Sequence, residues 1–363
     1  MKIREATYND LEGIKNLCVR NGLEIKKINE EVWKNHPSIN DFANVPIGWV
    51  IESENKKIVG VILNLFMTYH LNGKRYKASV VSTWAVDLEY RMRSLNLFQS
   101  WHNQTNVDIL VDNRRSERSV KLLQSYKFPN VPTKDYKNIL YWVFDYSNFF
   151  KSFIKKKTKL PISFLTIFPA FLFKFFDLFF RNNKNLKSEL NLKETSIFDE
   201  KFDVFWKNIP KKNKFISERN SANLKWHFER LIKNKKVFVL TINENEILKG
   251  YTILMRSDNL SIGLKRYKIV DLQVLDNDEN IILDLIRNAI IYSQNKGAHV
   301  LELSGFGAVV RNQALKTKPF TRKLSYSPFF YKLISKDLKL AFTDKVKWDA
   351  SLFDGDGSLD AID

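Results

Sequence analysis

Cysteine is almost absent from this chain of 363 residues, which contains only Cys18. A single cysteine excludes an internal disulfide and leaves no cysteine pair for a zinc ribbon. A reducing compartment fits this composition. The first residues, Met1 to Ala6, are charged and lack the apolar core of a signal peptide. We therefore expect the protein to stay in the cytoplasm.

The sequence also lacks a long uninterrupted apolar run. Its most apolar stretch, residues 164–180, is rich in phenylalanine but is interrupted by Pro169, Lys174 and Asp177. The part after Pro169 has only about 11 residues, whereas a bilayer crossing needs about 20 mostly apolar residues. Two interpretations stay open for this lysine-bordered stretch. It is either an interfacial helix that makes peripheral contact with an anionic membrane, or a connector packed between two lobes.

The residues that are present are typical of a soluble globular protein with a basic surface. Hydrophobic residues make up 44% of the chain and charged residues 27%. The length favours two lobes of about 150 residues each plus a connector. The net charge of +19 would attract nucleic acid, anionic lipid or phosphorylated small molecules. Lysine, asparagine and phenylalanine are abundant while glycine is scarce, so AT-rich coding is an alternative source of this charge.

The stretch from Ser82 to Asn96 organises the first half of the chain. An apolar run meets two arginines, Arg91 and Arg93, and then opens a helix. This pattern predicts a strand, a turn with outward-facing amides and a helix N-terminus. Such an arrangement is a ready site for phosphate.

The arginine-bearing turn resembles the central motif of the Gcn5-related N-acetyltransferases (GNAT), Arg/Gln-x-x-Gly-x-Gly/Ala. Arg91 matches the leading position, while Ser94 and Asn96 replace the two glycines that allow close backbone approach. The resemblance implies acetyl-CoA or another acyl-CoA as co-substrate, with no metal. The implied cofactor-binding residues are Trp84, Ala85, Val86, Arg91, Met92, Arg93, Ser94, Leu95 and Asn96.

A second GNAT signature, Asn-x-x-Ala-x-x-Leu-Tyr-x-x-x-Gly-Phe, is similar to residues 116–128. Leu123 stands where the family has the tyrosine that protonates the leaving thiolate, so the resemblance predicts that the usual general acid is missing. Tyr326 and Tyr331 are the alternative candidates to replace it. Asp87 and Glu89, at the end of the central strand, are the candidate bases, and the amides near Ala85 and Val86 are the candidate oxyanion donors.

The second half repeats the order of elements of the first. A predicted hairpin at 50–63 recurs at 237–254, and the strands at 83–88 and 107–111 recur at 268–274 and 299–303. We therefore predict an α/β (α+β) fold of tandem GNAT-like domains, each a mixed, mostly antiparallel sheet flanked by helices. The expected boundaries are an N-terminal domain at 1–148, a Phe-rich basic connector at 149–190 and a C-terminal domain at 191–363. The strand at 139–145 is expected to close the first lobe.

The acidic run from Asp276 to Asn280 occupies the phosphate-loop position of the second lobe and would repel a pyrophosphate, so CoA is not expected there. Trp226 and Phe228 are interpreted as core residues, and His227 lacks a second ligand at metal spacing. The tail residues Asp354, Gly355 and Asp356 either line a polar cleft or form a solvated end.

These patterns favour a cytoplasmic N-acyltransferase that moves an acyl group from acyl-CoA to an amine, such as an amino sugar or a cell-surface precursor. The resemblance is to two-lobed members found in bacterial surface-polysaccharide loci. One alternative is a non-catalytic binding protein that keeps the GNAT fold, which the missing glycines and tyrosine favour. Another is a tRNA-dependent aminoacyl-transferase, although no aromatic and basic stripe picks out a nucleic-acid surface.

Overall fold

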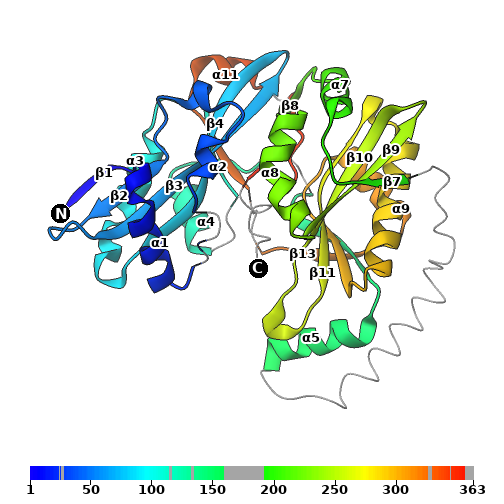
Figure 1. Cartoon of the computed structure of the whole chain (residues 1–363), viewed down its shortest axis with the longest axis horizontal. Coiled ribbons are helices and arrows are strands. Elements are labelled where there is room, and N and C mark those ends of the chain that lie inside the picture. The colour runs from blue at the N-terminus through cyan, green and yellow to red at the C-terminus, as the bar shows by residue number, and fades with distance from the viewer. Residues whose placement is uncertain are drawn as a thin grey trace.

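The computed structural model describes residues 1–23, 25, 28–113, 117–131, 135–158, 192–325, 329–343 and 345–355. The Phe-rich stretch at 164–180, Tyr326 and Asp356 lie outside these residues, so the structure does not address the roles predicted for them. The described strands form two sheets, one in each lobe (Figure 1). None of the described helices combines the length and the apolar character that a membrane span requires.

The first sheet is organised around a long hairpin. Its strand order is β1 (Lys2–Glu5), β2 (Gly48–Glu52), β3 (Ile58–Leu71), β4 (Lys74–Val86), β5 (Ile109–Asp112) and β14 (Phe330–Leu333). All neighbours are antiparallel except β4 and β5, which are parallel. Every residue of β3 is buried, which explains its near-continuous apolar sequence. The accompanying helices are η1 (Tyr8–Asp10), α1 (Leu11–Arg20), α2 (Glu31–Lys34), η2 (Ile39–Phe42), η3 (Leu88–Arg93), α3 (Ser94–His102) and α4 (Glu117–Ser125).

The second sheet repeats this plan. Its order is β13 (Phe320–Lys323), β6 (Asn138–Val143), β12 (Val300–Leu303), β11 (Arg266–Val274), β10 (Ile247–Arg256), β9 (Val237–Glu244) and β7 (Leu192–Thr195). The β9–β10 hairpin, the antiparallel β11 and the parallel β12 correspond in order and direction to β2, β3, β4 and β5. Its helices are α5 (Tyr146–Thr158), α7 (Glu200–Asn208), α8 (Ser221–Lys233), η5 (Leu260–Ile262), η6 (Leu275–Asn277), α9 (Glu279–Asn295) and α10 (Ala308–Lys316). The predicted fold class is confirmed, with two mostly antiparallel sheets flanked by helices.

Each sheet takes a strand from the other half of the chain, and this corrects one prediction. The strand at 139–145 does not close the first lobe, because β6 lies between β12 and β13 in the second sheet. In exchange, β14 from the C-terminal half pairs with β5 in the first sheet. Alternating apolar residues show that a segment is a strand but not which sheet edge accepts it. The two lobes are therefore interleaved rather than consecutive.

A shared aromatic core joins the two lobes. Strand β8 (Lys214–Ser217) pairs with the end of β3 and also with β15 (Lys347–Trp348), which follows α11 (Lys336–Ala341). The ring of Phe215 stacks on Tyr69 at 4.7 Å and lies 4.8 Å from that of Trp348. All three side chains are buried. Burial of this apolar surface holds the first sheet against the C-terminal half.

Candidate functional site

The strands β4 and β5 diverge part-way along the first sheet, and we call this divergence the β4–β5 cleft. The two strands pair only from Ala78 to Val80, against Ile109 to Val111, although β4 continues to Val86. A β-bulge shifts the β3–β4 register between Ile62 and Asn64 at the start of this separation. A bulge bends and twists a strand, which accounts for the divergence. Residues 81–86 consequently present an edge that β5 does not cover.

The orientation of backbone groups along this edge follows from the pairing. The Asp87 amide donates to the Val59 carbonyl at 2.9 Å. In an antiparallel pair the amides of alternate residues point to the same neighbour, so the Ala85 amide faces β3 and the Val86 amide faces the divergent side. Of the two predicted oxyanion donors, Val86 therefore has the suitable orientation and Ala85 does not.

The segment after β4 is helical from its beginning. Leu88–Arg93 forms η3, and α3 follows directly at Ser94, whose φ and ψ are −58° and −35°. A helical position of this kind does not require glycine, which explains how Ser94 and Asn96 replace the family's glycines. Arg91, Met92 and Arg93 are exposed, as are Leu95 and Asn96. Neither η3 nor α3 has a side-chain cap on its first amides.

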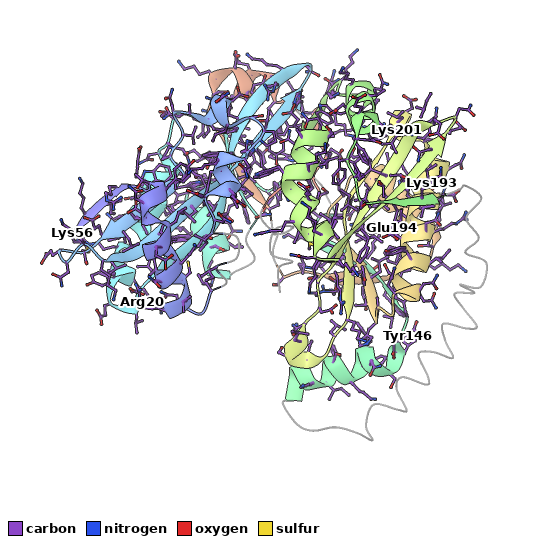
Figure 2. All side chains as sticks on the ribbon, in the orientation of Figure 1. Arg20, Lys56, Tyr146, Lys193, Glu194 and Lys201 are labelled. Atoms are coloured by element: carbon purple, nitrogen blue, oxygen red, sulfur yellow. The ribbon has the colours of Figure 1, made fainter. Side chains whose placement is uncertain are left out.

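A cavity of about 510 Å³ adjoins η3. Its lining consists of Arg20, Asn21, Lys57, Val59 and the residues from Asp87 to Arg91. Arg20, which lines the cavity, and Lys56, which precedes the lining residue Lys57 in the sequence, lie on the side of the first lobe away from the second lobe (Figure 2). The cavity thus places three cationic side chains and two carboxylates, those of Asp87 and Glu89, beside an uncapped helix start, and its net positive charge favours an anion.

The two candidate bases differ in their surroundings. The Asp87 carboxylate accepts a hydrogen bond from Arg20 at 2.8 Å and another from the Asn21 amide group at 2.9 Å. Glu89 lies on η3 and is exposed. Both line the same cavity. Trp84, predicted to contact the cofactor, packs its ring on Phe98 of α3 with centroids 5.7 Å apart.

The corresponding cleft of the second lobe is filled by the protein's own C-terminal segment. β11 pairs with β12 only from Arg266 to Ile269 and then separates from it. The Phe353 amide donates to the Val270 carbonyl at 3.2 Å, and the Phe306 amide donates to the Ala350 carbonyl at 2.9 Å. Residues 350–355 are buried. They therefore lie between the diverging strands and close this cleft.

The helix start of the second lobe is also occupied. The Asp278 carboxylate caps α9 by accepting from the amides of Asn280 and Ile281 at 2.8 and 3.1 Å. The acidic run thus supplies its own anion to the amides that a phosphate would otherwise use.

A buried charge network behind the C-terminal segment was missed by the sequence analysis. Arg219 lies between Asp271 at 2.8 Å and Asp354 at 3.4 Å, and Arg219 also donates to the Ser217 carbonyl at 2.8 Å. Asp354 is 0% exposed, so the expectation that it lines a polar cleft or a solvated end is wrong. Burial raises the pKa of Asp354. An aspartate inside the apolar run at 268–274 was the available signal, because such a charge requires a buried partner.

The aromatic helix α8 contributes mainly to the core. Phe228 is fully buried, as predicted, while Trp226 is half-buried and donates its Nε1 hydrogen to the Val32 carbonyl at 3.0 Å. His227 is buried, and burial lowers its pKa to about 3. Among the described residues, no group of three or more metal-ligating side chains comes together.

Comparisons with known proteins agree with this architecture. No protein-family model and no curated protein matches the sequence. Among solved structures, a GCN5-related N-acetyltransferase from Anabaena variabilis matches 92% of this chain and 73% of its own at 12% identity and a TM-score of 0.53. Saccharomyces cerevisiae N-myristoyltransferase with bound myristoyl-CoA matches 91% of this chain and 78% of its own at 11% identity and a TM-score of 0.52. A GCN5-related N-acetyltransferase from Kribbella flavida matches 92% and 70% at 10% identity and a TM-score of 0.51. At these identities the likeness concerns the fold: the chain has the two-lobed GNAT-like fold found in these N-acetyltransferase and N-myristoyltransferase structures.

Proposed function

We propose that this protein is an acyltransferase that uses acyl-CoA and modifies an amine in the cleft of its first lobe. The observation that carries the proposal is the contrast between the two clefts. In the part of the chain that the structure describes, the β4–β5 cleft has a strand edge that β5 does not cover and leads to an uncapped, arginine-bearing helix. The β11–β12 cleft is filled by residues 350–355, and its helix is capped by Asp278. Of the two helix starts, both within the described residues, the one in the first lobe adjoins a cavity with net positive charge and the one in the second lobe carries its own carboxylate cap.

The residues of this cleft fit an acyl-CoA. Arg91 and Arg93 lie in the last turn of η3, directly before the first amides of α3, and would hold the pyrophosphate through charge-assisted hydrogen bonds. The uncovered edge of β4 offers backbone groups to the amide-bearing pantetheine arm, and the Val86 amide would donate to the thioester oxygen. Transfer forms a bond between the acceptor nitrogen and the acyl carbon and breaks the carbon–sulfur bond. The amine proton passes through a chain of water molecules to a base, for which Glu89 and Asp87 are the candidates, and the thiolate is protonated as free CoA.

The acceptor is proposed to be an amino sugar or a cell-surface precursor. We place the protein in the cytoplasm, with the Phe-rich connector at 149–190 as a peripheral contact to anionic membrane. Two lysines near the end of α5, Lys155 and Lys156, are exposed at the start of this connector. Exchanging both for glutamate should release the protein from sedimenting anionic vesicles at low salt, since each basic residue contributes about 1 kcal/mol near such a surface. Unchanged sedimentation would favour the packed-connector interpretation.

The alternative of a non-catalytic binding protein is favoured by one observation. The carboxylate of Asp87 is held by Arg20 and Asn21, so it is less available as a base than an unpaired carboxylate would be. A binding protein of this kind would retain acyl-CoA without turning it over. Calorimetry combined with an assay of free CoA release in the presence of amine acceptors separates these two functions.

The deciding experiment is calorimetry with acetyl-CoA, longer acyl-CoAs and a charged tRNA. The double variant Arg91→Glu/Arg93→Glu should abolish acyl-CoA binding, because two charge-assisted contacts of about 1.5–3 kcal/mol each become repulsive. The matched control is Lys193→Glu/Lys201→Glu, which changes the net charge equally on the second lobe (Figure 2). The control should bind normally. If the Arg91/Arg93 variant binds acyl-CoA as well as the unmodified protein does, the acyl-CoA site lies elsewhere on the protein. Binding of charged tRNA without binding of any acyl-CoA would favour aminoacyl transfer.

A further inference from the structure

A buried hydroxyl without a partner lies where β4 leaves β5. Thr83 is 5% exposed, and its Oγ1 has no hydrogen-bond partner among the described residues. Thr83 belongs to the β-bulge between Val81 and Trp84. Buried polar groups are nearly always hydrogen-bonded, and bulges re-aim side chains next to active sites. The missing partner of Thr83 is therefore a clue to what the cleft binds.

The opposite wall of the cleft carries a second polar atom of the same kind. Asn113 directly follows β5, and its Oδ1 is buried without a hydrogen-bond partner among the described residues. Asn113 lies two positions after Val111, and Thr83 lies three positions after Val80, so both follow the last paired residues of their strands. Two unsatisfied polar atoms thus lie just beyond the point where β4 and β5 separate, one from each strand. A polar ligand would satisfy both.

The second lobe shows what docks at the equivalent position. Its bulge lies between Ile269 and Asp271, so the counterpart of Thr83 is Val270. There the carbonyl of Val270 accepts the amide hydrogen of Phe353 from the C-terminal segment. The bulge position of this fold can therefore receive an extended, amide-bearing chain. The first lobe differs in presenting a hydroxyl where the second presents an apolar side chain.

The position of Thr83 relative to η3 defines which part of an acyl-CoA it would meet. Leu88, the first residue of η3, lies five positions after Thr83. This separation corresponds to about 16 Å of strand. This length is comparable with that of an extended pantetheine arm. A donor whose pyrophosphate lies at η3 therefore brings its thioester to the bulge.

We propose that the Thr83 hydroxyl donates a hydrogen bond to the thioester carbonyl oxygen of the acyl donor. This inference rests on the proposed acyltransferase function and names a reacting-centre contact for it. The hydroxyl stabilises the negative charge that develops on that oxygen when the amine attacks. It takes the place of the Val86 amide in this role, because Val86 lies three residues, or about 10 Å of strand, closer to η3. Asn113 Oδ1, on the other wall, accepts a hydrogen from an N–H group of the same ligand. Binding thus satisfies two groups that folding leaves unpaired.

The test is Thr83→Val, which keeps the shape of the side chain and removes the hydroxyl. Because this hydroxyl has no partner in the folded protein, the melting temperature should stay the same or rise. The rate of CoA release from acyl-CoA, with water or a simple amine as nucleophile, should fall about 100-fold, as for the loss of one oxyanion donor. Thr83→Ser keeps the hydroxyl and should retain most of the rate.

A matched control exists on β3. The hydroxyl of Thr68 is also buried without a partner among the described residues, and Thr68 pairs with Lys77, away from the cleft. Thr68→Val should therefore affect the melting temperature as Thr83→Val does, while the rate of CoA release stays unchanged. An equal loss of rate in both variants would show a structural effect and overturn the inference.

Infrared spectroscopy of bound acyl-CoA, isotopically labelled at the thioester carbonyl, gives a direct reading. The hydrogen bond should shift the carbonyl band to lower frequency in the unmodified protein, and Thr83→Val should remove that shift while acyl-CoA still binds. If acyl-CoA binds but both band and rate are the same in the two proteins, the inference is wrong and the proposed function stands. If the unmodified protein binds no acyl-CoA, the proposed function fails and the inference fails with it.

Discussion

The two lobes share one strand order, yet they differ in what lies between their diverging strands. In the first lobe β4 separates from β5 and leaves its edge uncovered, and in the second lobe β11 separates from β12 but residues 350–355 lie between them. The difference is not in the sheets. It arises from a short C-terminal segment that follows β15 into the second cleft. A duplicated fold can therefore keep its topology while one copy loses its binding space.

The aspartates at the two helix starts show the same contrast. Asp278 turns back to the amides of α9, whereas Asp87, at the start of η3, is held by Arg20 and Asn21 instead. The first amides of η3 consequently keep no side-chain cap. Because an anion and a carboxylate cap compete for the same amides, we expect phosphate to bind at the helix start of the first lobe and not at that of the second.

The largest effect on the free energy of unfolding is expected from breaking the buried charge network beside the C-terminal segment in the second cleft. Arg219→Met would leave Asp271 and Asp354 buried without their cation, which should cost about 3–5 kcal/mol of the free energy of unfolding. The measurement is urea unfolding followed by circular dichroism. Lys233→Met, which removes an exposed ion pair with Glu229, is the control and should cost less than about 0.5 kcal/mol. Equal losses in the two variants would show that the network does not hold the C-terminal segment.

An intermediate effect on the free energy of unfolding is expected when the pH is lowered. It arises at the junction of the lobes, where His36 and His227 both pack against Trp226. Burial lowers their pKa values from 6.5 to about 4 and about 3. Both values lie below that of the unfolded chain, so the unfolded state binds more protons below pH 6.5 and stability falls as the pH falls. Each histidine should lower the free energy of unfolding by roughly 2 kcal/mol when the pH falls from 7 to 5.

His227→Phe tests this pH dependence. The variant should lose less unfolding free energy than the unmodified protein between pH 7 and pH 5, by roughly 2 kcal/mol. Urea titrations at both pH values measure the difference. The carboxylate of Asp10, whose pKa its hydrogen bond with Arg4 lowers to about 2, titrates only at more acidic pH and does not interfere. The same loss in both proteins would mean that the pKa of His227 is the same in the folded and unfolded states.

Local patterns predicted much of this fold but few of its long-range pairings. The repeated hairpins, the central strand and the helix after it lie where their apolar periodicity indicated. The placement of β6 in the second sheet and of residues 350–355 in the second cleft could not be predicted, because both depend on which open edge accepts a segment. Thr83 was missed for a similar reason. Its sequence context is an ordinary strand, and only the bulge and the lack of a hydrogen-bond partner single it out.

The smallest effect on the free energy of unfolding is expected from removing the carboxylate cap of α9 in the second lobe. Asp278→Ala removes the acceptor for two amides of α9 and should lower the free energy of unfolding by about 1 kcal/mol. Asp278→Asn keeps a capping oxygen but removes the charge, so it should cost only about 0.3–1 kcal/mol at low salt, and less at high salt. Thermal unfolding at two salt concentrations separates the two contributions. Neither variant should gain acyl-CoA binding at the second lobe, because residues 350–355 still fill its cleft. Acyl-CoA binding by a second site in Asp278→Ala would show that the carboxylate, and not the C-terminal segment, is what closes that lobe.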